Sequence, residues 1–185
     1  MELVRPRTLL CPRDLSEGAA ARLLLSSVLL LDVRDVTGGT LVFLVTDEPF
    51  MACCRVGDNP VRLRRVVADS YLVVPDAQRV SALLVERLGT LPRTLIGARQ
   101  LAELLFGTTD LEEAVYQLTG GALPPARAAR PAPSTEELVH ELSRLLMLRL
   151  AVKRAVRRMG DQELLLAILR SYCGLLDGMR INQNA

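Results

Sequence analysis

The chain has 185 residues, which is enough to bury one hydrophobic core with at most a small helical addition. Half of the residues are hydrophobic but only 3% are aromatic, which makes base-stacking surfaces of the single-strand-binding type unexpected. With 23 basic and 21 acidic residues, the formal charge of +2 gives no overall attraction to nucleic acid, so any basic patch must be local.

The chain contains four cysteines: Cys11, Cys53, Cys54 and Cys173. Their spacing matches neither a zinc site nor a redox pair, which favours a reducing, intracellular compartment. The longest strongly apolar run, Leu23–Val33, is interrupted by polar residues that include Asp32, and it is too short to span a bilayer. The first residues lack the pattern of a secretory signal, so none is expected.

The stretch from Leu29 to Asp76 alternates short runs of Val, Leu and Phe with turns such as Gly38-Gly39, the pattern of antiparallel strands. Before it, we expect a first strand in Glu2–Cys11 and a short helix in Pro12–Ala21 with Ser16 as its N-cap. The further predicted strands are Leu23–Val33, Thr40–Thr46, Phe50–Val56, Val61–Val67 and Tyr71–Pro75. Such a set should curl into a half-barrel that cannot cover its own apolar face, so we expect another chain to complete it.

From Thr94 onward the hydrophobic period becomes helical. One helix is predicted over Thr94–Phe106, and Gly107 is suited to end it. A shorter helix follows over Asp110–Leu118, with the aspartate as its N-cap. This half of the chain should therefore supply helices and no strands.

Residues 119–133 are rich in Gly, Ala, Pro and Arg and predict a linker. Ser134 and Glu137 then form a capping-box pattern that opens a helix running to about Met159. A last helix is expected over Asp161–Gly178, with its aspartate as the cap.

These elements predict an α+β protein. An N-terminal antiparallel β half-barrel is followed by helices, a linker and a small C-terminal helical segment equivalent at most to part of a winged helix. The expected division is a barrel-type partner-binding domain with closing helices over residues 1–118, the linker over 119–133 and the helical segment over 134–185.

No motif for chemistry is evident in the sequence, whether a phosphate-cradling glycine loop, a metal-binding helix or a nucleophile elbow. His140 is the sole histidine and has no second catalytic group placed beside it, so a structural or exposed role is favoured. Cys53 lies in an apolar strand, where a cysteine is more often a small core residue than a nucleophile. We therefore expect no enzymatic activity, no cofactor, no metal ion and no small-molecule substrate.

Basic residues recur along one face of the helix expected after Ser134, at spacings close to four residues. They are Arg149, Lys153, Arg154, Arg157 and Arg158. This basic stripe could lie against a phosphate backbone without reading sequence. The favoured alternative is a solvated helix face whose cations lie near the negative end of the helix dipole.

The region 47–76 resembles the sister-chromatid cohesion subunit of the alternative replication-factor-C clamp loader. The parts that carry the resemblance are Met51-Ala52-Cys53-Cys54, Asp58-Asn59, Val61–Val67, Asp69-Ser70 and Leu72–Pro75. Outside this region, Leu29–Val33, Leu91–Gly107 and Ser134–Leu138 are also similar to segments of that family.

The resemblance implies a non-catalytic adaptor in the nucleus that acts in DNA replication and sister-chromatid cohesion. Its partners would be other clamp-loader subunits, namely the C-terminal tail of the large subunit and a small subunit that completes a shared β-barrel. DNA would be reached through the loader complex, and no membrane is involved. The residues expected to bind the partners are Leu41, Phe43, Val45, Met51, Cys53, Val61 and Leu63.

A second interpretation, from a different class, is a small autonomous nucleic-acid-binding protein that uses the basic stripe. Its affinity for DNA would fall steeply with salt and with loss of Arg149 and Lys153, because each phosphate contact releases a counterion.

Overall fold

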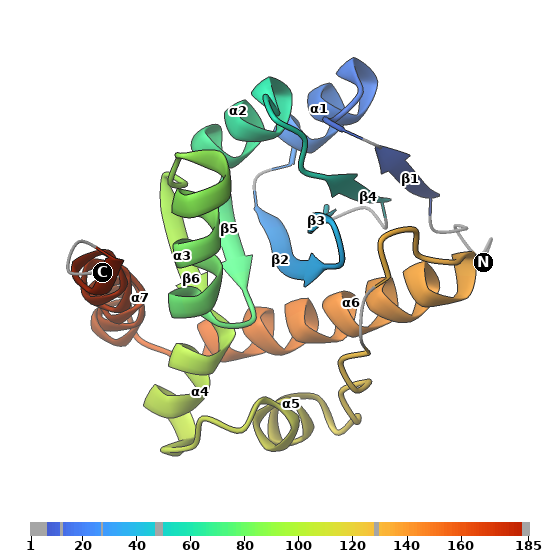
Figure 1. Cartoon of the computed structure of the whole chain (residues 1–185). Coiled ribbons are helices and arrows are strands. Elements are labelled where there is room, and N and C mark those ends of the chain that lie inside the picture. The colour runs from blue at the N-terminus through green and yellow to red at the C-terminus, as the bar shows by residue number, and fades with distance from the viewer. Residues whose placement is uncertain (1–6, 12, 27, 47–49, 128–129, 183–185) are drawn as a thin grey trace.

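The computed structural model describes residues 7–11, 13–26, 28–46, 50–127 and 130–182, and within them one six-stranded sheet is surrounded by seven helices (Figure 1). The strands are β1 (Arg7–Cys11), β2 (Leu29–Val36), β3 (Gly39–Val45), β4 (Phe50–Arg55), β5 (Tyr71–Val74) and β6 (Thr94–Gly97). The helices are α1 (Glu17–Leu24), α2 (Val61–Asp69), α3 (Ala77–Leu88), α4 (Ala98–Phe106), α5 (Leu111–Thr119), α6 (Thr135–Arg158) and α7 (Asp161–Asn182).

The strands lie in the order β1-β4-β3-β2-β5-β6. Strands β2, β3 and β4 form an antiparallel meander, whereas β5 and β6 continue the sheet parallel to β2, and β1 pairs in parallel with β4. The predicted turn Gly38-Gly39 joins β2 to β3, and its glycines have φ values of 81° and 149° that favour residues without a Cβ. The chain thus combines a sheet with helices, which confirms the coarse part of the predicted α+β class.

The predicted half-barrel is wrong, because helices cover both faces of an open sheet. Helices α1, α2 and α3 share one apolar core with one face of the sheet, and α4, α5 and α6 share a second core with the other face. The predicted strand Leu23–Val33 is correct only from Leu29 onward, because Leu23 and Leu24 end helix α1. Within β2, Leu29 and Leu31 belong to the first core and Leu30 to the second. The apolar face that was expected to need another chain is therefore covered by the chain's own helices.

The predicted strand Val61–Val67 is wrong, because these residues form the first part of helix α2. The buried side chains of α2 have the helical spacing i, i+3 and i+4: Leu63, Val66 and Val67. Asp14, 48 residues earlier, accepts hydrogen bonds of 2.9 Å from the backbone N–H groups of Arg62 and Leu63. A distant residue therefore caps this helix, which a local pattern could not indicate.

The predicted helix Thr94–Phe106 is correct only from Ala98 onward, because its first four residues form β6. Gly107 ends α4 in the left-handed conformation, with φ 68°, as predicted. The sequence pattern predicted no element between β5 and β6, but helix α3 connects these two strands. The strands β5 and β6 are parallel, so their connection has to cross over the sheet.

Three of the four predicted helix caps are confirmed, whereas Asp161 is the first residue inside α7 and not its cap. Ser16 caps α1, Asp110 caps α5, and Ser134 forms a capping box with Glu137 at the start of α6. The predicted first strand is observed from Arg7 onward, and residues 2–6 lie outside the described part. None of the helices in the described ranges is long and apolar enough to cross a membrane.

Candidate functional site

The topology of the sheet directs attention to the carboxyl ends of β2 and β5. From β2, the chain builds β3 and β4 on one side, and it later adds β5 and β6 on the other side. In open α/β sheets, ligands bind outside the carboxyl ends of the strands at the point where the order reverses. Figure 1 shows that α6 passes along this part of the sheet.

Asp32 is the centre of this region, a carboxylate on β2 whose side chain is 0% exposed. Its Oδ1 accepts hydrogen bonds from the guanidinium of Arg79 at 2.7 Å and from the backbone N–H of Val33 at 2.9 Å. Its Oδ2 accepts from Arg34 at 2.7 Å and from Arg144 at 3.4 Å. A carboxylate offers about four lone-pair positions, so every acceptor position of Asp32 is occupied.

Glu141 is the second buried carboxylate of the region and lies on α6. Its Oε1 accepts from Arg34 at 3.0 Å and from Arg144 at 3.2 Å. Burial opposes the charge of Arg34, but the attraction of Asp32 and Glu141 and their hydrogen bonds outweigh it and raise the pKa of Arg34.

We call this group the Asp32 cluster; it consists of Asp32, Glu141, Arg34, Arg79 and Arg144. Its three guanidinium groups outnumber its two carboxylates, so the cluster carries one net positive charge. Buried charges are tolerated only when they are paired in this manner.

The first turns of α3 and α4 hold two half-exposed cations at this edge, Arg79 of the cluster and one further residue, Arg99. Asp76 caps α3 and accepts a 2.8 Å hydrogen bond from Arg99, which lies in the first turn of α4. The side chains of Arg79 and Arg99 are 48% and 47% exposed, so each guanidinium is held by a carboxylate and still reaches solvent. Helix N-termini add partial positive charge at this edge.

The segment formed by residues 123–127 lies against the cluster. The backbone carbonyl oxygen of Arg127 accepts a 3.1 Å hydrogen bond from Arg34, and Leu123 is buried. His140 of α6 donates to the carbonyl oxygen of Pro125 at 2.8 Å. The described part of this segment is therefore attached to α6 and β2 by hydrogen bonds and burial.

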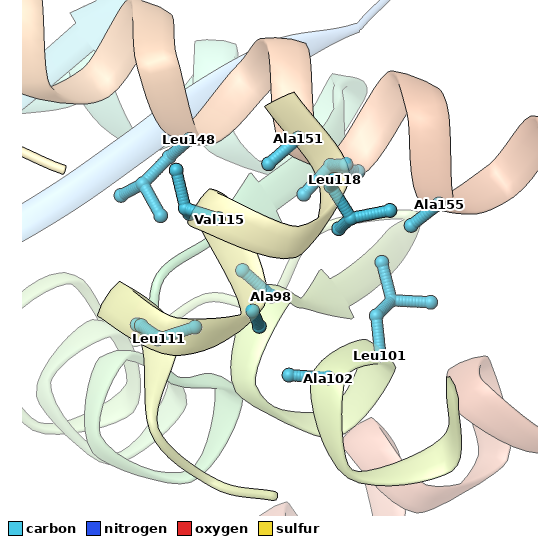
Figure 2. A pocket seen from close by; sticks show the side chains of 11 residues that line it. Ala98, Leu101, Ala102, Leu111, Val115, Leu118, Leu148, Ala151 and Ala155 are labelled. Atoms are coloured by element: carbon cyan, nitrogen blue, oxygen red, sulfur yellow. The ribbon is translucent and has the colours of Figure 1, made fainter. Parts of the chain in front are cut away.

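An open hollow of about 520 Å³ lies beside the cluster. Its lining includes the cations Arg99 and Arg144 and the carboxylates Asp110 and Glu112. A second pocket, shown in Figure 2, lies between α4, α5 and α6 and is lined by Ala, Leu and Val side chains alone. Because it offers no polar group to orient a ligand, this second pocket is part of the apolar packing.

The residues expected to bind partners are placed in two different environments. Five of them are buried in the core beneath α6: Leu41, Phe43, Val45, Met51 and Cys53. Leu63 is buried in the other core, and Val61 is exposed on α2. The five residues of the first group belong to the apolar core that the sheet shares with α4, α5 and α6. Their role in binding a partner stays a prediction.

The interpretation of Cys53 as a core residue is supported by its burial. Desolvation raises the pKa of Cys53 to about 12, and that of Cys54 also to about 12, so neither is a ready thiolate. Cys11 is also a buried free thiol. His140 has the structural role that was predicted, because its ring holds the segment at Pro125.

The basic stripe is on α6 as predicted, although its members differ in surroundings. Burial lowers the pKa of Arg149, which is partly buried. Arg154 donates a 2.9 Å hydrogen bond to the carbonyl oxygen of Leu118 on α5. The exposed members are Lys153, Arg154, Arg157 and Arg158. Contact of this stripe with nucleic acid stays a prediction.

None of the five residues of the Asp32 cluster was singled out from the sequence, although two signals were present. Asp32 and Arg34 are two apart in a strand and therefore point to the same face, directly after three consecutive leucines. Glu141 and Arg144 are three apart and share the helix face that carries Leu138 and Leu145. Charged pairs on faces that should be buried mark such a site.

The fold is similar to that of solved structures of exonuclease-like nucleases. A structure described as the apo form of a nuclease has a TM-score of 0.76 at 14% identity, over 93% of this chain and 91% of that one. NrnC of Brucella melitensis with bound Mg²⁺ has a TM-score of 0.73 at 13% identity, over 94% of this chain and 92% of its own.

Escherichia coli RNase D, an exoribonuclease involved in structured RNA processing, has a TM-score of 0.68 at 15% identity. It is matched over 91% of this chain and 51% of its own length. No family model matches the sequence, and no curated protein matches it. At these identities the likeness establishes the fold.

The resemblance to a clamp-loader subunit is wrong, because the similar structures are nucleases. The expectations of a non-catalytic adaptor in replication and cohesion, of clamp-loader partners and of a protein outside the enzyme classes are overturned by the same comparison. The resemblance depended on residue classes along short strands, and such classes recur wherever strands are buried. Its central strand, Val61–Val67, is helical.

Proposed function

We propose that this chain acts on nucleic acid as a nuclease-type protein and holds the strand by its phosphates at the carboxyl ends of β2, β5 and β6. The observation that carries the proposal is the placement of Arg79 and Arg99 in the first turns of neighbouring helices. Both are half-exposed, and both are oriented by buried or half-buried carboxylates beside the Asp32 cluster.

Two further features support phosphate as the group that is bound. Arginine presents several N–H donors in a planar fork that suits phosphate oxygens. The hollow beside Arg99 and Arg144 has the volume of a ligand site and is open, as the passage of a chain requires. The nuclease structures with the same fold support nucleic acid as the source of that phosphate.

The test is fluorescence anisotropy of end-labelled single-stranded DNA and RNA oligonucleotides, measured over a range of salt concentrations. Replacing Arg79 and Arg99 together by Gln should weaken binding and reduce the salt slope, log Kd against log salt, by about 2, because two phosphate contacts are lost. Gel analysis of the same mixtures records any shortening of the strand.

The matched control is the double change Arg65→Gln and Arg87→Gln. It removes the same charge from exposed positions, and Arg87 lies in the last turn of α3, at the other end from Arg79. The control should keep the wild-type slope. Equal slopes for the two double variants would refute the proposed edge.

The basic stripe is tested by the same measurement. If it also contacts the strand, Lys153→Gln with Arg157→Gln should lower the salt slope further, independently of Arg79 and Arg99. Both residues are exposed on α6, so the change should leave the stability of the fold nearly unaltered.

A further inference from the structure

At least one protein of this fold binds Mg²⁺, namely NrnC. Mg²⁺ takes oxygen ligands in near-octahedral geometry, usually one or two carboxylates with several waters. Within the described ranges, the buried carboxylates are Asp32 and Glu141, and both belong to the Asp32 cluster. If the described part of the chain held Mg²⁺ on buried carboxylates, the ion would have to bind in this cluster.

The donor set does not fit Mg²⁺. Both oxygens of Asp32 already accept two hydrogen bonds each, and Oε1 of Glu141 accepts two from arginines. An incoming cation would have to displace charged donors that lie between 2.7 and 3.4 Å from Asp32. It would also meet a cluster whose net charge is already positive.

A buried donor without a partner points in the same direction. Nε of Arg144 is buried and has no acceptor in the structure, although the side chain is only 9% exposed. The cluster thus presents an unsatisfied donor, whereas a cation site has to present acceptors. An anion or a water oxygen could satisfy this N–H group, but a metal ion could not.

We infer that the Asp32 cluster is closed to divalent metal ions because its own guanidinium groups occupy the place of the cation, and that a nucleic-acid strand binds at this edge without Mg²⁺. The second half of this inference rests on the proposed function. No hydrolytic step through a metal ion is derived for this chain.

The first experiment uses the wild-type chain and Mn²⁺ as the probe. The electron paramagnetic resonance signal of hydrated Mn²⁺ should keep its amplitude when equimolar protein is added. The melting temperature should be the same in MgCl₂ and in NaCl of equal ionic strength, because a ligand that binds only the folded state would raise it.

If the Mn²⁺ signal does fall, two variants show whether the ion is bound at Asp32 or elsewhere on the chain. Loss that persists in Asp35→Asn but disappears in Asp32→Asn would overturn the inference, since it places the ion on Asp32. Loss that persists in Asp32→Asn places the ion elsewhere and supports the inference. Asp35 is the exposed aspartate of the same strand, so the two changes are matched.

A gain-of-binding variant tests the cause. Arg34→Gln with Arg144→Gln removes both donors from Oδ2 of Asp32 and both from Oε1 of Glu141. Two neighbouring carboxylates then regain free oxygens, and the folded variant should take up Mn²⁺. If the folded variant still binds no Mn²⁺, the arginines are not what excludes the ion and the inference is overturned. If the variant does not fold, the Mn²⁺ titration of the wild-type chain decides.

The last experiment separates this inference from the proposed function. Oligonucleotide affinity should be the same with Mg²⁺ and with a chelator at equal ionic strength, and a requirement for Mg²⁺ would overturn metal-free binding. A chain that binds no oligonucleotide under either condition refutes the proposed function, while the Mn²⁺ titration still decides whether the cluster is closed.

Discussion

The sharpest test of the Asp32 cluster is Asp32→Asn, which keeps the shape of the side chain and removes its charge. Arg34 and Arg144 have side chains only 12% and 9% exposed, so they would be left with Glu141 as their shared carboxylate. Removing one partner of a buried ion pair costs about 3–5 kcal/mol. The half-exposed Arg79 should add at most about 1 kcal/mol to this loss.

Because Asn keeps one acceptor oxygen, we expect Asp32→Asn to lower the free energy of unfolding by about 3 kcal/mol, near the lower end of the range for a buried ion pair. The assay is urea denaturation followed by circular dichroism, with the midpoint and slope measured for each variant. The matched control, Asp35→Asn, keeps the oxygen that accepts from Thr40 and should change stability by less than about 0.5 kcal/mol.

A second change tests whether the loss comes from unpaired arginine. In the Asp32→Asn background, Arg144→Met should cost less than in the wild type, with a coupling energy of about 1–3 kcal/mol. The reasoning would be refuted if Asp32→Asn and Asp35→Asn had the same midpoint and slope. Additive effects of the two changes would likewise show that Asp32 does not hold Arg144.

Three further predictions concern the fold. Below the unfolded pKa of 9.0, Cys53 and Cys54 should not react with a thiol reagent unless the chain is denatured. Because burial raises their pKa to about 12, the stability that these thiols contribute is complete below pH 9.0 and is lost as the pH rises toward 12. The loss should appear as a lower urea midpoint. Asp14→Ala should cost about 1–2 kcal/mol through loss of the α2 cap, whereas Glu17→Gln, in an exposed first turn, should cost little. Ser134→Ala should cost about 1 kcal/mol by removing the capping box of α6, and an unchanged midpoint would contradict the role given to it.

The sequence by itself determined the elements whose signals are local. The caps at Ser16, Asp110 and Ser134 were predicted because a side chain bonds to backbone groups two or three residues away. Strands β3 and β4 were predicted because apolar runs of this length between turn residues are typical of strands and too short for most helices. The three consecutive leucines that open β2 point alternately to the two cores, as expected of a strand between two layers of helices.

Tertiary structure decided what these elements become together. Residues 61–67 contain a pattern that fits both a strand and a helix, and the cap from Asp14 is available only once β1 and α1 are in place. The parallel β5-α3-β6 unit depends on pairing between strands that are 23 residues apart, which leaves little trace in a four-residue strand. An open sheet with two covered faces therefore replaced the expected half-barrel.

The candidate site was decided by tertiary structure for the same reason. Arg34 shares strand β2 with Asp32, but Arg79 and Arg144 belong to α3 and α6, and nothing within these two helices indicates that they meet Asp32. Opposite charges buried at sites far apart in the sequence must find each other, because an unpaired charge in the core costs several kcal/mol. The sequence supplies the charges, and only the packed sheet determines that arginines surround the one carboxylate at its centre.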